Sequence, residues 1–99
     1  MTIRLVKREE EAELLLSGRL DAAASLEAES IFEELAETYE RVILNLAGLD
    51  YVSSGGLRLI KQFHIRMVKK GGVLVLTNVS RMVMEVFEMT GFAGFLKIE

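Results

Sequence analysis

Two adjacent serines followed by two glycines form the segment of this sequence with the clearest chemical potential. Ser53, Ser54, Gly55 and Gly56 stand between a continuous apolar run and an amphipathic run. This order predicts that the two hydroxyls lie where a strand ends and a helix begins. A hydroxyl in that place can cap the helix, hold an anion against its free N–H groups, or accept a phosphoryl group.

Nucleophilic catalysis by either serine is not favoured, because it requires a general base within hydrogen-bonding distance. The single histidine, His64, lies ten residues beyond Ser54 in the expected helix, about 15 Å away along an axis that rises about 1.5 Å per residue. The glycines match neither a Walker loop nor a G-x-S-x-G turn. With one histidine and no cysteine, we expect no metal site, no cofactor, no catalytic residue and no enzymatic activity.

Phosphorylation of Ser54 is compatible with the predicted start of a helix, where free N–H groups and the helix dipole favour negative charge. A phosphoserine adds about −1.5 to −2 charges and three acceptor oxygens. A partner surface that fits the neutral serine and the small glycines would then meet charge and bulk. The residues alone leave open whether Ser54 accepts a phosphate or is an N-cap that contributes about 1 kcal/mol to the helix.

Length and composition indicate one domain that spans residues 1–99. The chain is 51% hydrophobic and lacks cysteine, so it can bury a core without disulfides. We expect no signal peptide at its N-terminus, and no stretch approaches the roughly 18 apolar residues of a membrane span. We therefore expect a cytoplasmic protein.

Charge is distributed unevenly along the chain. Residues 1–50 carry 12 acids and 5 bases, whereas residues 51–99 carry 3 acids and 7 bases, so the halves have net charges of −7 and +4. This asymmetry is typical either of separate solvated faces or of an electrostatically oriented partner surface. Because the overall charge is −3 and no recognised nucleic-acid-binding motif is present, nucleic acid is not expected as a partner.

Hydrophobic periodicity predicts the elements that position the serines. Strands are expected at 2–7, 12–17, 41–47, 73–76 and 94–98, and helices at 22–39, 55–69 and 81–89. The order β-β-α-β-α-β-α-β predicts an α/β fold, a mixed sheet with helices packed against it. The loops at 48–54 and 77–80 follow parallel strands and should emerge at the same edge of the sheet.

Several side chains receive specific expectations from this pattern. Asp21 is expected to cap the helix that follows it. Leu57, Ile60, His64 and Met67 are expected to form the inner stripe of the 55–69 helix, with Arg58 facing outward. Met82, Met84 and Met89 are interpreted as adaptable core residues.

Four segments along nearly the whole chain resemble the motifs of STAS domains, the anti-sigma factor antagonist family. The first comprises 42–46 followed by 49–57, with the serines and glycines near its end. The others are Gly18-Arg19-Leu20-Asp21, Gly71-Gly72-Val73-Leu74-Val75-Leu76 and Val86-Phe87-Glu88-Met89-Thr90-Gly91-Phe92. The resemblance implies a single STAS-like α/β domain without enzymatic activity of its own.

The resemblance also implies a role in partner switching that regulates bacterial transcription. An unphosphorylated antagonist captures an anti-sigma factor serine kinase and frees the sigma factor, phosphorylation on serine ends the capture, and a serine phosphatase resets it. Ser54 falls on the phosphoacceptor, and Asp21 on the loop aspartate that lies near it. Ser53 stands where well-studied members have aspartate, and Gly55 where a small residue is usual. The expected partner-binding residues are Asp21, Ser53, Ser54, Gly55, Gly56 and Arg58.

Two other functions stay open at this point. STAS domains also serve as accessory subunits of lipid transport complexes and as components of stress-sensing assemblies, in which the 53–57 surface would dock a partner without phosphorylation. A module that binds a small ligand or nucleotide through the anion-binding helix start is the third possibility.

Overall fold

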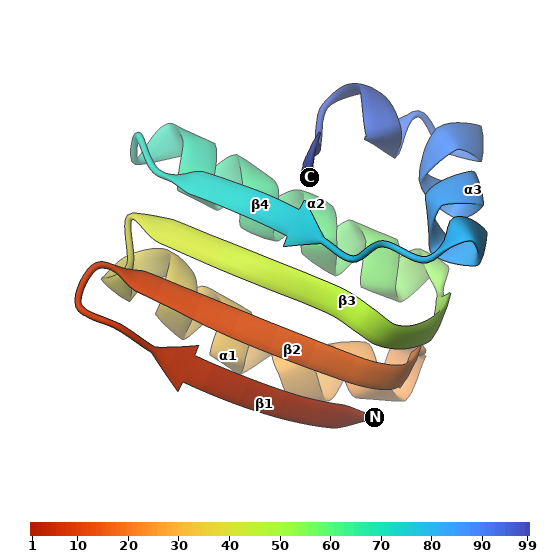
Figure 1. Cartoon of the computed structure of the whole chain (residues 1–99), viewed down its shortest axis with the longest axis horizontal. Coiled ribbons are helices and arrows are strands. Elements are labelled where there is room, and N and C mark those ends of the chain that lie inside the picture. The colour runs from red at the N-terminus through yellow and green to blue at the C-terminus, as the bar shows by residue number, and fades with distance from the viewer.

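Alternating apolar residues in neighbouring strands place the core on one face of a five-stranded mixed sheet. The computed structural model describes residues 1–99, and its strands are ordered β1-β2-β3-β4-β5 (Figure 1). The elements are β1 (Thr2–Lys7), β2 (Glu11–Leu20), α1 (Ala22–Thr38), β3 (Arg41–Val52), α2 (Ser54–Lys69), β4 (Val73–Thr77), α3 (Arg81–Met89), a short 3₁₀ helix (Phe92–Gly94) and β5 (Lys97–Ile98). The predicted α/β class and mixed sheet are confirmed.

The register of the sheet aligns the core residues of adjacent strands. β1 and β2 form an antiparallel hairpin, and the other neighbouring strands pair in parallel. Leu14 pairs with Leu44, which in turn pairs with Leu76, and all three side chains are fully buried. Side chains of one strand alternate between the two faces, so this row and its alternate neighbours form the floor of the core.

Helices α1 and α2 lie behind the sheet in Figure 1 and cover this apolar face. They also pack on each other, with the rings of Phe32 and Phe63 separated by 4.8 Å between centroids. The opposite face of β2 and β3 is polar: Arg41 Nε lies 2.9 Å from Glu11 Oε1, and the Asn45 side-chain amide donates to Glu13 at 3.1 Å. The main apolar cluster therefore lies on the helix-covered side, while Val75 of β4 is buried on the opposite face.

The predicted loop at 48–54 is wrong over most of its length, because β3 continues to Val52 and β2 continues to Leu20. Leu20 pairs with Val52 after register shifts near Ser17 and Gly18. These irregularities interrupt the two-residue alternation, so the strand signal in the sequence fades before the strands end. Gly48 permits the close approach, since a Cβ there would lie 2.9 Å from Ser17 Cβ.

The three helices, β1 and β4 begin and end within one residue of their predicted ranges. The last strand is shorter than predicted, because the 3₁₀ helix occupies the start of the 94–98 segment.

The interpretation of the methionines as core residues is wrong for Met82 and Met89, which are 62% and 87% exposed. Helix α3 is short and buries only Val83 and Phe87, one turn apart.

The predicted inner stripe of α2 is displaced around the helix. Its buried side chains are Leu59, Ile60, Phe63 and Met67, whereas Leu57 and His64 are only half-buried. The displacement has a physical reason, because α2 packs on α1 as well as on the sheet and turns Phe63 toward Phe32. His64 instead contacts the C-terminal segment, with its ring centroid 5.4 Å from that of Phe95.

None of the helices combines the length and the apolar character that crossing a membrane requires.

Candidate partner-binding site

The starts of α1 and α2 lie side by side at the carboxyl ends of two paired strands. Leu20 and Val52 pair at the ends of β2 and β3, and Asp21 and Ser53 follow them directly. The Ser53 N–H donates to the Leu20 carbonyl at 2.9 Å. Two helix caps therefore meet at one edge of the sheet, as expected for loops that follow parallel strands.

Ser53, and not Ser54, caps α2. The Ser53 hydroxyl accepts a hydrogen bond from the Gly56 N–H at 3.1 Å, and its backbone is extended, which is the usual geometry of an N-cap. Ser54 is the first residue of the helix and is exposed. The two serines thus have different structural positions, and the Ser54 hydroxyl makes no hydrogen bond that holds the fold.

Asp21 caps α1, as predicted from the sequence. Its Oδ1 accepts from the Ala24 N–H at 2.9 Å, and its carbonyl oxygen accepts from the Ser25 hydroxyl at 2.7 Å. The second of these bonds satisfies Ser25, the buried polar residue of the core. Asp21 is half-buried, so its carboxylate serves the helix and remains accessible at the same edge as Ser54.

The two glycines have different tolerances for a side chain. A Cβ at Gly56 would lie 2.9 Å from both the carbonyl oxygen and Cγ of Leu20, whereas at Gly55 the nearest atom would be Ser53 Oγ at 3.7 Å. Gly56 therefore allows the first turn of α2 to sit directly on the end of β2. Gly55 leaves an open surface beside Ser54.

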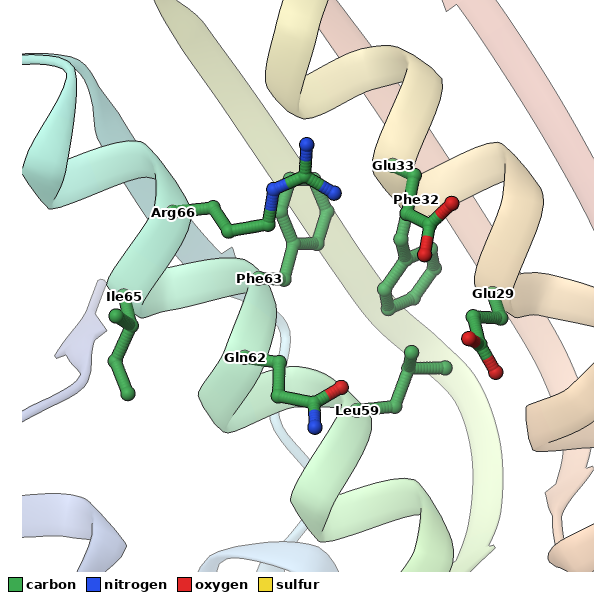
Figure 2. A pocket seen from close by; sticks show the side chains of 8 residues that line it. All are labelled: Glu29, Phe32, Glu33, Leu59, Gln62, Phe63, Ile65 and Arg66. Atoms are coloured by element: carbon green, nitrogen blue, oxygen red, sulfur yellow. The ribbon is translucent and has the colours of Figure 1, made fainter.

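A shallow groove runs between α1 and α2 from this edge. Two adjoining clefts of ≈ 210 and ≈ 330 Å³ share Glu29, Leu59 and Gln62, and the second cleft reaches Gly55 and Arg58. Figure 2 shows the glutamates projecting from α1 on one side, the side chains of α2 on the other, and the two phenylalanine rings between the helices. The groove therefore reaches the residue that follows the exposed Ser54.

Acidic and basic residues of the uneven sequence lie on different helices, the acids on α1 and the bases on α2, and these two helices pack together. The exposed acids of α1 are Glu27, Glu29, Glu33, Glu34 and Glu37, and the bases of α2 are Arg58, Lys61, Arg66 and Lys69. One ion pair joins them, Arg66 Nη2 to Glu37 Oε1 at 3.4 Å. Since this pair is exposed, it contributes little to stability, and most charges of the two helices are available to a partner.

Most of the predicted site residues come together at this edge. The strand pairing and the two caps bring Asp21, Ser53, Ser54, Gly55 and Gly56 to one place, and Arg58 lies one helical turn further on. No group of three or more His, Asp or Glu side chains is placed to hold a metal ion. The edge therefore presents small and charged groups on one surface.

Sequence reasoning missed the contact between Leu20 and Gly56 and the exposed Leu26. The first has no sequence signal beyond the glycine itself, because it depends on how far β2 extends. Leu26 is 74% exposed and lines the groove near Gly55. The sequence did indicate this exposure, because Leu26 is an apolar residue that lies outside the buried stripe of α1.

Known proteins share the fold of this chain. The candidate anti-sigma factor antagonist BtrV of Bordetella bronchiseptica is 37% identical to this chain over 78 residues, which cover 75% of the chain and 67% of BtrV. The structure of TM1081 from Thermotoga maritima, also a candidate anti-sigma factor antagonist, superposes with a TM-score of 0.88 at 19% identity, covering 97% of this chain and 84% of the other.

SpoIIAA, the Bacillus anti-sigma factor antagonist, has been solved in two forms that both share the fold. Its unphosphorylated form gives a TM-score of 0.80 at 19% identity, with 99% of this chain and 87% of the other covered. Its phosphorylated form gives 0.79 at 20% identity, with 99% and 91% covered. At these identities the likeness is one of fold.

The fold defines a small α/β domain whose parallel strands end at the starts of two adjacent helices. The model of the STAS domain family matches residues 2–99. The chain belongs to the STAS domain family, and the resemblance seen in its sequence motifs is confirmed.

Proposed function

We propose that this chain is an anti-sigma factor antagonist that binds an anti-sigma factor serine kinase and is switched off by phosphorylation of Ser54. The observation that carries the proposal is that the two serines have different structural positions. Ser53 is committed to the cap of α2, while Ser54 is exposed beside it. The Ser54 hydroxyl can therefore be modified without breaking a bond that the fold requires.

The proposed partner surface consists of Asp21, Ser53, Ser54, Gly55, Gly56 and Arg58. The glycines leave room for a close approach of the kinase, and the charged residues flank the serine on two sides. Association with the kinase would release the sigma factor from it. The relatives support this role, because BtrV, TM1081 and SpoIIAA are described as anti-sigma factor antagonists or candidates for that role.

The chemistry of the switch belongs to the partner enzymes. The kinase forms a bond between Ser54 Oγ and the γ-phosphorus of ATP, the bond from that phosphorus to the β-phosphate oxygen breaks, and the hydroxyl proton passes to a base of the kinase. The products are phosphoserine and ADP. A serine phosphatase then hydrolyses the ester with water and returns the hydroxyl and inorganic phosphate.

A phosphate at Ser54 adds about −1.5 to −2 charges at the centre of this surface. A partner that was complementary to the neutral serine would have to accommodate this charge without supplying a cation of its own, and the cost of doing so weakens the complex. The helix start itself tolerates the phosphate, because its free N–H groups favour an anion. The phosphate therefore acts on binding and leaves the fold intact.

The test is incubation with the cognate kinase and ATP, followed by peptide mass spectrometry. We expect one phosphate, on Ser54, and none on the Ser54→Ala variant. Ser54→Ala should retain kinase binding, whereas Ser54→Asp should weaken it. Phosphate on another residue, or no phosphate with a kinase that binds, would contradict the proposal; the second result would favour docking without phosphorylation.

A further inference from the structure

Arg58 lies one helical turn beyond Ser54 on the exposed surface of α2. Both residues are exposed and belong to the same uninterrupted helix. Residues four apart in an α-helix are surface neighbours, and an acidic group N-terminal to a basic one is the favourable order. The pair is therefore arranged so that an anion at position 54 meets the guanidinium at position 58.

The guanidinium of Arg58 is not engaged elsewhere. None of the ion pairs in the structure includes it. Glu29 lines the same cleft across the groove but forms no ion pair with Arg58. A phosphate with nearly twice the charge of a carboxylate, held on the same helix, is the stronger attractor for this cation.

Arg19, the other cation near this edge, is directed elsewhere. Its guanidinium carbon lies 4.1 Å from the ring centroid of Tyr51. Leu20 and Val52 are buried toward the helices, so the pair one residue earlier, Arg19 and Tyr51, faces the opposite side of the sheet. Arg58 is therefore the cation placed to meet a phosphate on α2.

We propose that Arg58 binds the phosphate of phosphorylated Ser54 within the same chain and that phosphorylation thereby withdraws Arg58 from the partner surface. The inference rests on the proposed function for the modification itself. The switch then has two parts, the arrival of negative charge and the loss of an available guanidinium. A partner that uses an acidic group to recognise Arg58 loses that contact when the phosphate arrives.

The experiment introduces phosphoserine at position 54 during translation, so that no kinase is required. Four full-length proteins form a cycle: Ser54 or phosphoserine at position 54, each with Arg58 or with Arg58→Gln. We expect the phosphorylated protein with Arg58 to melt about 2–4 °C above the phosphorylated Arg58→Gln protein. The two unphosphorylated proteins should differ by less than about 1 °C, because Arg58 is exposed and unpaired.

Two further variants separate the pair from a general effect of charge. Arg58→Lys should restore at least part of the melting difference, because it keeps the cation at position 58. Lys61→Gln removes a cation two turns from Ser54, beyond the reach of the phosphate, and should leave the difference unchanged. The Arg58 Nε–Hε signal in ¹⁵N NMR should shift on phosphorylation, and about 0.5 M salt should reduce both effects.

Equal melting temperatures for the two phosphorylated proteins would overturn the inference. An Arg58 Nε–Hε signal that does not shift on phosphorylation would overturn it as well. The proposed function would survive that result if the kinase still modifies Ser54. Conversely, a kinase that leaves Ser54 unmodified contradicts the proposed function, while the translationally phosphorylated proteins still decide whether Arg58 holds a phosphate.

Discussion

The Ser53 N–H donates to the Leu20 carbonyl oxygen at 2.9 Å, and this bond joins the start of α2 to the end of β2. Because Asp21 follows Leu20 and Ser54 follows Ser53, the bond also holds Asp21 and Ser54 at the same edge of the sheet. The same carbonyl limits the first turn of α2, where a Cβ at Gly56 would lie 2.9 Å away. The position of Ser54 thus depends on a backbone contact that only a glycine allows.

Replacing Gly56 with alanine should destabilise the protein by about 1–3 kcal/mol, because the added methyl must displace the backbone of Leu20. The higher helix propensity of alanine, about 1 kcal/mol over glycine, offsets only part of this cost. Urea denaturation followed by circular dichroism would measure the loss.

Gly55→Ala is the matched control for this change. Its Cβ would meet no atom closer than 3.7 Å, so alanine should leave stability unchanged or raise it by up to about 1 kcal/mol. Equal destabilisation by both substitutions would show that the contact with Leu20 is not what excludes a side chain at Gly56.

The sequence was sufficient to predict the order of elements and to place the candidate site residues at one edge of the sheet, but not the separate structural positions of the two serines. Helical periodicity located α1 and α2, and the cap signal of Asp21 was correct. The extension of β3 to Val52 was not predictable, because pairing with the irregular end of β2 stabilises it. That extension moves the cap to Ser53 and leaves Ser54 exposed, a difference of one residue that periodicity does not resolve.

The two serines should respond differently to alanine. Ser53→Ala removes the hydroxyl that accepts from the Gly56 N–H and should cost about 1 kcal/mol of unfolding free energy. Ser54→Ala changes an exposed group and should remain within about 0.5 kcal/mol of the parent. Chemical denaturation of the two variants side by side measures this contrast, and a larger loss for Ser54→Ala would reverse the assignment of the cap.

Asp21 should combine a structural role with a role in partner binding, and two substitutions separate them. Asparagine retains an oxygen that can accept from the Ala24 N–H, so Asp21→Asn should change stability little, whereas Asp21→Ala should cost about 1 kcal/mol. If the carboxylate contributes charge to the partner surface, Asp21→Asn should nevertheless weaken kinase binding in calorimetry. Unchanged affinity for Asp21→Asn would restrict Asp21 to its role as the cap of α1.

The serine at position 53, where well-studied members of the family carry aspartate, should affect the phosphorylated form more than the unphosphorylated one. Aspartate and asparagine cap helices about as well as serine, so Ser53→Asp and Ser53→Asn should both remain within about 0.5 kcal/mol of the parent before modification.

With phosphoserine at position 54, Ser53→Asp would place two negative groups next to each other. The phosphorylated Ser53→Asp protein should therefore be less stable than its asparagine counterpart by about 0.5–1 kcal/mol, a difference that salt should reduce. Thermal unfolding of both translationally phosphorylated proteins measures it. Equal stability would mean that a negative charge at position 53 does not act on a phosphate at position 54. A lower stability would mean that an aspartate at position 53 repels a phosphate on Ser54, and that the serine present in this chain avoids that repulsion.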